Sequence, residues 1–305
     1  MFARLCIIGV GLIGGSVARA ARQHQLCTNI VAFGRLDDKQ NLETAKRLGV
    51  IDAYYFDIAD AVKDADCVII ATPVNSIESI FTLLKPYWSV NTIYTDVGST
   101  KASVVSAAER VFGAVPDNLV PAHPVAGREK SGVEASIADL FLHKRLIITP
   151  LNTTDLAALQ KIQTFWERCG AIVSLVDAAR HDAILAATSH LPHIVAFALV
   201  DMLGHQDEQN AIFNCAAGGF KDFTRIASSD PVMWRDICLA NKHEIIPLLE
   251  QTRTQLDKIQ QMLENDDSQQ LFSLFAYANT ARQRFLNQFE GTMSKSITFQ
   301  VQHNF

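Results

Sequence analysis

Short apolar runs alternate with segments of helical periodicity through the first 176 residues of the chain. The runs are rich in β-branched residues and apolar throughout, as expected for strands that are covered on both faces of a parallel sheet. The predicted strands are residues 5–8, 30–33, 67–71, 92–95, 119–121, 146–149 and 172–175. The predicted helices between them are residues 13–22, 41–48, 76–84, 103–111 and 155–169. This alternation predicts an α/β domain built from βαβ units.

The pattern changes at Asp177, after which every periodic segment is helical. Residues 177–203 form one long helical pattern that Pro192 interrupts, and residues 231–263 and 268–289 form two more. We therefore expect an all-helical second domain over residues 177–290. Residues 291–305 are polar, and we expect a loosely ordered tail there unless a partner holds it.

The helical half carries more apolar positions than one small helical layer can bury, above all in residues 184–203 and in the helices after Pro231. A surplus of exposed apolar surface marks an interaction site. We therefore expect a homodimer that forms through the helical domain.

Composition narrows the class of protein. A length of 305 residues fits two domains, and 49% hydrophobic with 19% charged residues is an ordinary globular balance. The formal net charge is −5 and no long basic run occurs, so we expect no nucleic-acid partner. The six cysteines form no C-x-x-C pair, and several lie inside apolar runs, as Cys67 does. That distribution favours free thiols in a reducing compartment over disulfides or a zinc site.

The beginning of the chain is apolar, but the run passes into Gly9 without a small-residue cleavage site. No stretch looks long enough to span a bilayer. We therefore expect a cytoplasmic protein that has no membrane partner.

The segment Gly9-Val10-Gly11-Leu12-Ile13-Gly14 matches the G-x-G-x-x-G pattern, directly after a predicted strand and at the start of a helix. In this pattern the first glycine allows a tight turn, the second lets a pyrophosphate approach the backbone, and the third lets the helix pack against the strand. The unpaired N–H groups and the dipole of the helix favour the anion. The motif predicts a Rossmann-type dinucleotide-binding domain over residues 1–176, against the alternative of an ordinary glycine-rich turn.

The end of the second predicted strand bears on the choice between NAD and NADP. NAD-binding folds usually place Asp or Glu there to hold the ribose hydroxyls. Here Gly34 occupies that position and Arg35 follows it. A guanidinium suits the 2′-phosphate that a carboxylate would repel. We therefore expect NADP, bound by Arg35; the alternative is a solvated Arg35, with Asp37 or Asp38 binding the ribose of NAD.

Polar segments follow three predicted strands at their carboxyl ends, where open α/β sheets bind ligands. They are Ala71-Thr72-Pro73-Val74, Asp96-Val97-Gly98-Ser99-Thr100-Lys101 and Ala122-His123-Pro124-Val125-Ala126-Gly127. Ser99 and His123 form a plausible proton-handling pair if they meet there. His123 also follows a strand and lies between two prolines, unlike a structural histidine on an apolar helix face. Cofactor contacts are expected from Thr72, Pro73, Thr100 and Lys101.

The helical half adds further candidates. Ser189-His190-Leu191-Pro192-His193 places two histidines on one side of a helix. No acidic or cysteine ligand accompanies them at a diagnostic spacing, so we expect no metal site. A substrate-site role and a structural role at a proline kink both remain open for them. Arg225, after a glycine-rich helix start, suits a carboxylate, whereas Lys221 and Asp222 also fit an exposed face.

Together these segments resemble the prephenate/arogenate (cyclohexadienyl) dehydrogenase family. The resemblance follows the family's order up to about residue 289. Its first stretch is generic to dinucleotide-binding folds, and the combination of the others is highly specific. The stretches that carry it are Gly9-Val10-Gly11-Leu12-Ile13-Gly14-Gly15-Ser16, Asp96-Val97-Gly98-Ser99-Thr100-Lys101, His123-Pro124-Val125-Ala126-Gly127 with Ser131-Gly132, Ser189-His190-Leu191-Pro192-His193, Gly219-Phe220-Lys221-Asp222-Phe223-Thr224-Arg225 and Asp230-Pro231-Val232-Met233-Trp234-Arg235.

The resemblance implies a Rossmann domain and a helical dimerisation domain with the active site between them. It implies oxidative decarboxylation of prephenate or L-arogenate, with hydride transfer to a nicotinamide cofactor, giving 4-hydroxyphenylpyruvate or L-tyrosine in tyrosine biosynthesis. It further implies that His123 takes the proton of the ring hydroxyl, that Ser99 orients this pair, and that Arg225 binds a substrate carboxylate. The other implied substrate-site residues are His190, His193, Lys221, Asp222 and Trp234. In this family Gly34-Arg35 is similar to the NADP-using members.

Two other functions compete with this one. Dehydrogenases of the β-hydroxyacid or 6-phosphogluconate type use a helical lysine in a glycine-rich motif followed by paired asparagines, which this sequence lacks. A nucleotide-sensing module without turnover would show a disabled Ser99 or His123 segment, and neither segment looks disabled. We expect no chorismate-mutase segment before Met1 and no regulatory domain after Phe289. No residue identifies whether prephenate or arogenate is preferred.

Overall fold

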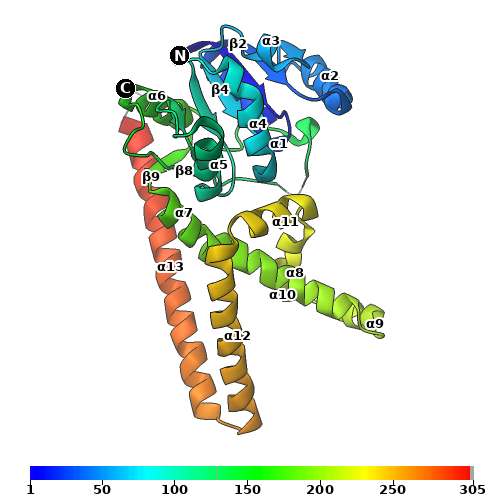
Figure 1. Cartoon of the computed structure of the whole chain (residues 1–305). Helices are drawn as coiled ribbons and strands as arrows, with labels where there is room; N and C mark the ends of the chain where they lie inside the picture. Colours follow the sequence, from blue (N-terminus) through cyan, green and yellow to red (C-terminus); the bar gives the residue numbers. More distant parts are fainter. Residues whose placement is uncertain (129, 303–305) are drawn as a thin grey trace. The chain divides into compact units, whose positions relative to one another are not determined.

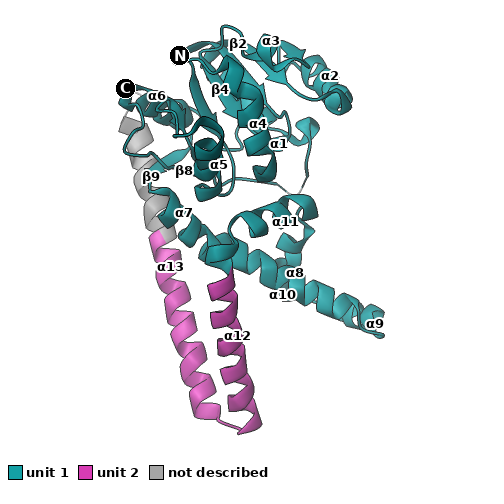
Figure 2. Cartoon of the chain, viewed as in Figure 1, with its two compact units in different colours: residues 1–245 teal, residues 246–305 magenta. Residues whose placement is uncertain are grey.

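The computed structural model describes residues 1–128 and 130–302, with only the backbone described for residues 289–302. Its contacts divide the chain into two compact units, Met1–Ile245 and Ile246–Phe305 (Figure 2). The first unit holds all the strands of the described residues and every candidate site residue.

A six-stranded parallel sheet of order β3-β2-β1-β4-β5-β6 forms the centre of the first unit (Figure 1). Its strands are β1 (Phe2–Ile8), β2 (Cys27–Phe33), β3 (Ala53–Tyr55), β4 (Cys67–Ile70), β5 (Ile93–Asp96) and β6 (Leu119–Val120). The predicted α/β, Rossmann-type fold is confirmed. β3 has three half-buried residues, too few for the sequence pattern to reveal it.

Both faces of this sheet are buried, as the uniformly apolar strands indicated. Leu5 and Ile7 of β1 join one hydrophobic cluster, and Cys6 and Ile8 join the other. Side chains alternate between the faces of a strand, so each face needs its own cover. The covering helices are α1 (Leu12–Gln23), α2 (Lys39–Arg47), α3 (Ile58–Val62), α4 (Ile77–Leu84), α5 (Ala102–Phe112) and α6 (Leu156–Arg168).

A second, three-stranded sheet follows directly. It contains β7 (Ala122–Pro124), β8 (Arg145–Ile148) and β9 (Ile172–Leu175), with β7 antiparallel and β9 parallel to β8. The chain leaves the first sheet at Pro121, which cannot donate a ladder hydrogen bond, and enters the second one residue later. His123 pairs with Ile147 of β8, a strand that the sequence predicted as residues 146–149, whereas the short β7 that contains His123 was not predicted.

After Asp177 the elements of the described chain are all helical, as predicted. They are α7 (Ala178–Leu185), a π-helical turn (Ala186–His190), α8 (Leu191–Gly204), α9 (Gln209–Asn214), α10 (Gly218–Thr224), a 3₁₀ turn (Arg225–Ser228), α11 (Pro231–Ala240), α12 (Lys242–Glu264) and α13 (Ser268–Gln302).

The expected interruption at Pro192 takes the form of a π turn inside one continuous helix. Pro192 lies in the first turn of α8, immediately after residues 186–190. Proline lacks the N–H that the α-helical ladder needs, and the wider turn absorbs the mismatch. π turns often occur at functional sites, and this one carries His190.

This continuous helix corrects one expectation. Ala178–Gly204 has 27 residues, and an 18-residue window within it has a mean hydropathy of 1.7, so by length and composition it is long and apolar enough to cross a membrane. Only 22% of that 18-residue window is buried. However, the helix carries the buried polar side chains of His181 and Asp182, which are bonded to groups of the α/β fold. A helix anchored in this way is better explained as part of a protein core and its interaction surface.

The second unit consists of the helical segment from Ile246 to Glu264 and of α13 (Figure 2). α13 continues to Gln302, so residues 291–302, which were expected to form a loosely ordered polar tail, have a helical backbone here. Residues 303–305 lie outside the described residues. Large apolar side chains are exposed along both helices of this unit: Ile246, Leu256, Leu263, Phe272, Phe275, Tyr277 and Phe285.

Candidate active site

The glycine-rich turn between β1 and α1 has the geometry of a dinucleotide cradle. Gly9 has φ +92°, and a Cβ there would lie 2.8 Å from the carbonyl oxygen of Ala71. A Cβ on Gly14 would lie 2.1 Å from the oxygen of Gly9, whereas a Cβ on Gly11 would meet nothing within 4 Å. The space beside Gly11 is therefore open, and no side chain caps the first turn of α1. Its N–H groups are available to an anion such as a pyrophosphate.

The other predicted cofactor residues differ in what they offer. Leu12 and Ile13 are half-buried in the first turn of α1, and Pro73 is exposed after β4. The Thr72 hydroxyl is buried without a hydrogen-bond partner among the described residues, which suits a ligand at the end of β4. The Thr100 hydroxyl is already paired with Ser103 at 2.7 Å.

Lys101 lies behind the site, which corrects its assignment as a cofactor contact. Its side chain is fully buried, and its ammonium group donates to the Asp96 carboxylate and, at 2.7 Å, to the carbonyl oxygen of Ala122. Asp96 also accepts from the backbone of Ala122 at 3.2 Å. Burial lowers the pKa of Lys101, and the adjacent Asp96 opposes that shift. The buried pair ties β5 to the backbone that immediately precedes His123.

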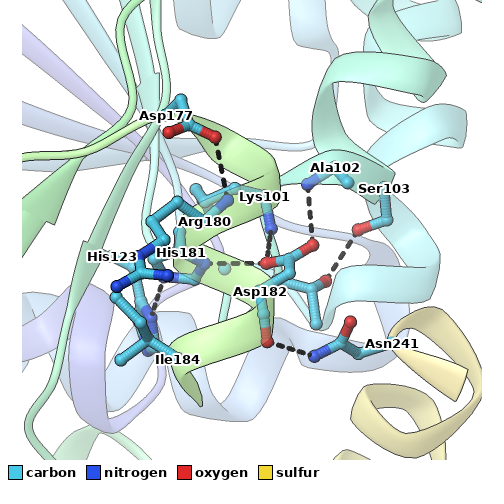
Figure 3. Close-up of polar contacts among 12 residues, drawn as sticks. Lys101, Ala102, Ser103, His123, Asp177, Arg180, His181, Asp182, Ile184 and Asn241 are labelled. Atoms are coloured by element: carbon cyan, nitrogen blue, oxygen red, sulfur yellow. Dashed lines mark hydrogen bonds and ion pairs between the residues drawn. The ribbon is translucent and has the colours of Figure 1, made fainter. Parts of the chain in front are cut away.

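His123 is joined to two polar side chains of α7 (Figure 3). Its Nδ1 lies 2.9 Å from Nε2 of His181, and Nδ1 of His181 lies 2.7 Å from Oδ1 of Asp182. The same carboxylate accepts from the backbone N–H groups of Lys101, at 2.8 Å, and Ala102, at 2.9 Å. All three side chains of the chain His123–His181–Asp182 are buried.

Burial and hydrogen bonding determine the protonation of His123 and Asp182 in this hydrogen-bonded series. Burial places the pKa of His123 well below its usual range, and positive charge on His181, Lys101 or His190 would lower it further. Burial alone would raise the pKa of Asp182, but the hydrogen bonds from His181, Lys101 and Ala102 lower it overall. A neutral imidazole therefore faces an ionised carboxylate through His181, as a general base requires.

The structure does not bring Ser99 and His123 together by a hydrogen bond among the described residues. Ser99 is half-buried in the turn before α5, and the described bond to Nδ1 of His123 comes from His181. The sequence analysis missed His181 and Asp182. Their signal was a polar pair inside the otherwise apolar helical pattern that begins at Asp177.

A second cluster surrounds the π turn. Nδ1 of His190 lies 3.1 Å from the side-chain nitrogen of Asn241, which also donates to the carbonyl oxygen of Asp182 at 2.9 Å. Burial lowers the pKa of His190 to about 4. His193 stacks on Trp234 with ring centroids 3.7 Å apart, and the buried indole N–H of Trp234 has no partner in the described part of the chain. An unpaired donor beside an aromatic platform can serve a planar ligand.

The charged candidates lie at the rim of this cluster. Arg225 is exposed in the 3₁₀ turn that packs on α8, and Lys221 and Asp222 are exposed on α10. The pKa of His193 is lowered first by burial and also by the positive charge of Arg225, which places the two side chains near each other. Within residues 1–128 and 130–288, whose side chains the structure describes, no group of three or more His, Cys, Asp or Glu could hold a metal ion.

Arg35 extends into solvent after β2. Its side chain is 75% exposed and pairs with Asp37 at 3.2 Å. Exposed pairs of this kind contribute little and exchange readily with a charged ligand. Arg35, which we expect to bind the 2′-phosphate, and Asp37, one of the two acids considered for the ribose, therefore lie together after β2.

The open glycine-rich turn and the buried imidazole at the carboxyl side of the sheet are features of one class of protein, the dinucleotide-dependent oxidoreductases. Comparison with known proteins narrows it. Residues 17–175 match the family model "Prephenate dehydrogenase, nucleotide-binding domain", and residues 177–277 match "Prephenate dehydrogenase, dimerization domain". The chain belongs to the prephenate dehydrogenase family.

Individual relatives agree with this. A cyclohexadienyl dehydrogenase of Zymomonas mobilis is 34% identical over 287 residues, covering 92% of this chain and 96% of that protein. A prephenate dehydrogenase of Bacillus subtilis is 37% identical over 280 residues, covering 91% and 75%. The solved structure of Aquifex aeolicus prephenate dehydrogenase with hydroxyphenyl propionate and NAD+ has a TM-score of 0.86 and 34% identity, and the match covers 93% of this chain and 99% of that one.

Proposed function

We propose that the chain catalyses oxidative decarboxylation of prephenate, L-arogenate or both, with a nicotinamide cofactor as hydride acceptor. The product is 4-hydroxyphenylpyruvate from prephenate or L-tyrosine from arogenate, which makes it an enzyme of tyrosine biosynthesis. The observation that carries the proposal is a buried, uncharged His123 in a chain whose relatives at 34% and 37% identity are cyclohexadienyl and prephenate dehydrogenases.

In this mechanism the chain's own residues position the substrate and handle its proton. Nε2 of His123 accepts the hydroxyl proton as the ring carbonyl develops. Arg225 pairs with a substrate carboxylate, and Trp234 with His190 and His193 lines the ring. Ser99 borders the hydroxyl from the turn before α5, and Lys221 and Asp222 support the rim. Gly9, Gly11 and Gly14 would hold a nicotinamide cofactor, which would supply the hydride acceptor, and loss of carbon dioxide from the oxidised ring would leave it aromatic.

We further propose NADP as the preferred cofactor. Two observations support it: Gly34 stands where an acid would bind ribose, and the exposed Arg35 extends from the same strand end. Asp37 lies within 3.2 Å of Arg35 and is the residue through which NAD would compete. The Aquifex relative was solved with NAD+, so cofactor choice has to be measured for this chain.

We propose a homodimer built on the helical domain, in a cytoplasmic enzyme. Residues 177–277 match a dimerization domain, and the described helices of the second unit expose seven large apolar side chains. A cover by a second copy removes those side chains from water. Light scattering at micromolar concentration is expected to give twice the chain mass of 33.6 kDa, and a monomer alone would contradict this.

Initial rates for two substrates against two cofactors test the proposal. We expect turnover of prephenate, arogenate or both, fastest with NADP, and release of carbon dioxide in equal amount to the reduced cofactor. Reduction without carbon dioxide would point to a different dehydrogenase. No turnover of either substrate would refute the function.

A further inference from the structure

We propose that His181 and Asp182 are positioning residues for the proton transfer made by His123. Asp182, acting through His181, fixes which nitrogen of His123 is left without a proton. The inference deepens the proposed function and rests on it, since it concerns the same base.

The hydrogen bonds dictate the proton positions. The Asp182 carboxylate is an acceptor only, and the N–H groups of Lys101 and Ala102 hold it in place at 2.8 and 2.9 Å. Nδ1 of His181, 2.7 Å away, must therefore carry a proton. A neutral His181 then has its lone pair on Nε2, 2.9 Å from Nδ1 of His123, which must donate. His123 is left with its lone pair on Nε2.

The surroundings keep this arrangement fixed. His181 has no exposed surface and Asp182 is 3% exposed, so solvent does not compete for their hydrogen bonds. Asn241 holds the carbonyl oxygen of Asp182, and Lys101 holds that of Ala122, the residue before His123. Among the described residues no hydrogen bond is made to Nε2 of His123, so this atom is the one left for a substrate hydroxyl.

The hydrogen-bonded series His123–His181–Asp182 also stabilises the positive charge that proton transfer creates. The substrate O–H bond breaks, its electron pair forms the ring carbonyl as hydride leaves, and a new N–H bond forms on Nε2 of His123. The Nδ1 proton then passes to Nε2 of His181, whose positive charge faces Asp182. Lys101 and His190 oppose the charge on His123, whereas Asp182 is the anion at the far end of the chain. After product release the protons return and Nε2 gives its proton to water.

A merely structural role is the competing explanation, because Asp182 also caps the beginning of α5 through Lys101 and Ala102. His181 makes no such backbone bond among those described for its side chain, so it gives the cleaner variant. Asp177 supplies the control, since it caps the same helix α7 through the N–H of Arg180 and is exposed (Figure 3).

A double-mutant cycle separates the two explanations. His181→Phe is expected to lower kcat about 10- to 150-fold, which corresponds to about 1.5–3 kcal/mol for a hydrogen bond to a charged group. In the His123→Asn background the same change is expected to cost less than about threefold, because residues acting as a unit are not additive. His181→Gln, whose amide oxygen can still accept from His123, should recover part of kcat. Asp177→Ala should lower the melting temperature while kcat stays within about twofold.

An equal loss in both backgrounds, or a kcat that His181→Phe leaves unchanged, would overturn the proposal. Nitrogen-15 NMR of the histidine rings tests it without substrate: His123 should carry its proton on Nδ1 at neutral pH. Asp182→Asn should shift that proton toward Nε2, because an amide can donate to His181. A wild-type His123 protonated on Nε2 would refute the relay even in an active enzyme. Failure to turn over prephenate or arogenate would refute the proposed function and leave this NMR result to stand on its own.

Discussion

The residues proposed to handle the proton and the cations proposed to bind ligands have opposite environments in this chain. His123, His181, Asp182 and the Lys101–Asp96 pair are buried and bonded to one another in the free chain. Arg225 and Arg35 are exposed. The first group is organised by the fold alone, whereas the second is exposed, in keeping with the proposal that these cations bind charges of the substrate and cofactor.

This difference has an energetic reason. A base must be uncharged at the working pH, which burial of an imidazole favours, and the cost of burial is offset by hydrogen bonds to its neighbours. A cation that captures a carboxylate or phosphate must remain accessible and hydrated until its partner binds. Replacing a residue of the first group should therefore change the chemical step, and replacing one of the second should change binding.

The largest effect is expected from His123→Asn. Losing a general base typically costs about 10²–10⁴-fold, so kcat should fall by that factor while cofactor affinity, measured by fluorescence titration, stays the same. His143→Asn is a matched control, since His143 lies outside the site with φ 59°, a conformation that asparagine adopts readily. A loss of less than about tenfold would remove His123 from its assigned role.

The next largest effect is expected at acid pH, where the buried histidines should lower the free energy of unfolding. The pKa of His190 is about 4 in the folded chain and about 6.5 unfolded, so the unfolded state binds the proton more readily. The stability is complete above pH 6.5 and is lost as pH falls toward 4, by about 3 kcal/mol from this group. Urea titrations across this window measure the slope. It should become shallower in His190→Gln, because His123 and His193 also have lowered pKa values and keep part of the slope, and it should be unchanged in His205→Gln, whose side chain is 80% exposed. An unchanged slope in His190→Gln would contradict the prediction.

The capture of substrate by Arg225 should show a smaller effect. Removing one partner of a charge pair costs about 2 kcal/mol at the lower end, which fits an exposed side chain and corresponds to roughly 30-fold in KM for prephenate. KM for the cofactor should not move, and Arg225→Lys should recover only part, because an ammonium lacks the forked geometry. Arg110→Ala, which breaks an exposed pair with Glu78, is the control. A lower melting temperature with both KM values raised would instead indicate that Arg225 holds the helix.

The contrast between the two groups also explains what sequence could predict. The sheet and most helices could be predicted from the apolar pattern. In β1, for example, successive side chains point to opposite faces of the sheet, and both faces are buried, so the whole strand is apolar. His123 was found because it follows a strand between two prolines. His181 and Asp182 escaped, since their importance arises from bonds to residues 58 and 81 positions away. The spacing of residues in the sequence predicts which side chains are neighbours on one helix or strand, but it does not predict contacts between elements that are far apart in the sequence.

Lys101 is the opposite case: the sequence analysis assigned it a ligand contact, and the structure places its side chain in the interior. Its place at the end of a family motif suggested a ligand contact, but its ammonium points into the protein toward Asp96 and Ala122. A lysine at a strand end has the same sequence signal whether it faces solvent or core. α13 is similar: a polar composition predicted a tail, whereas the backbone continues as a helix to Gln302.

The smallest expected effect concerns the cofactor and separates Arg35 from Asp37. Arg35→Ala should lower kcat/KM for NADP about tenfold, or about 1.4 kcal/mol, and leave NAD nearly unchanged, because only NADP carries the 2′-phosphate. Asp37→Ala should favour NADP further by removing a nearby negative charge.

Gly34→Asp combined with Arg35→Ala should shift preference toward NAD, since the acid binds ribose and repels the phosphate. A Cβ at residue 34 would lie 2.8 Å from a methyl of the buried Leu42, so this pair of changes should also lower the melting temperature as Leu42 shifts. Arg35→Ala alone avoids that strain and is the decisive variant. If its ratio of kcat/KM for NADP over NAD equals that of the wild type, Arg35 does not read the phosphate; if the wild type already prefers NAD and Asp37→Ala abolishes that preference, Asp37 is the ribose ligand.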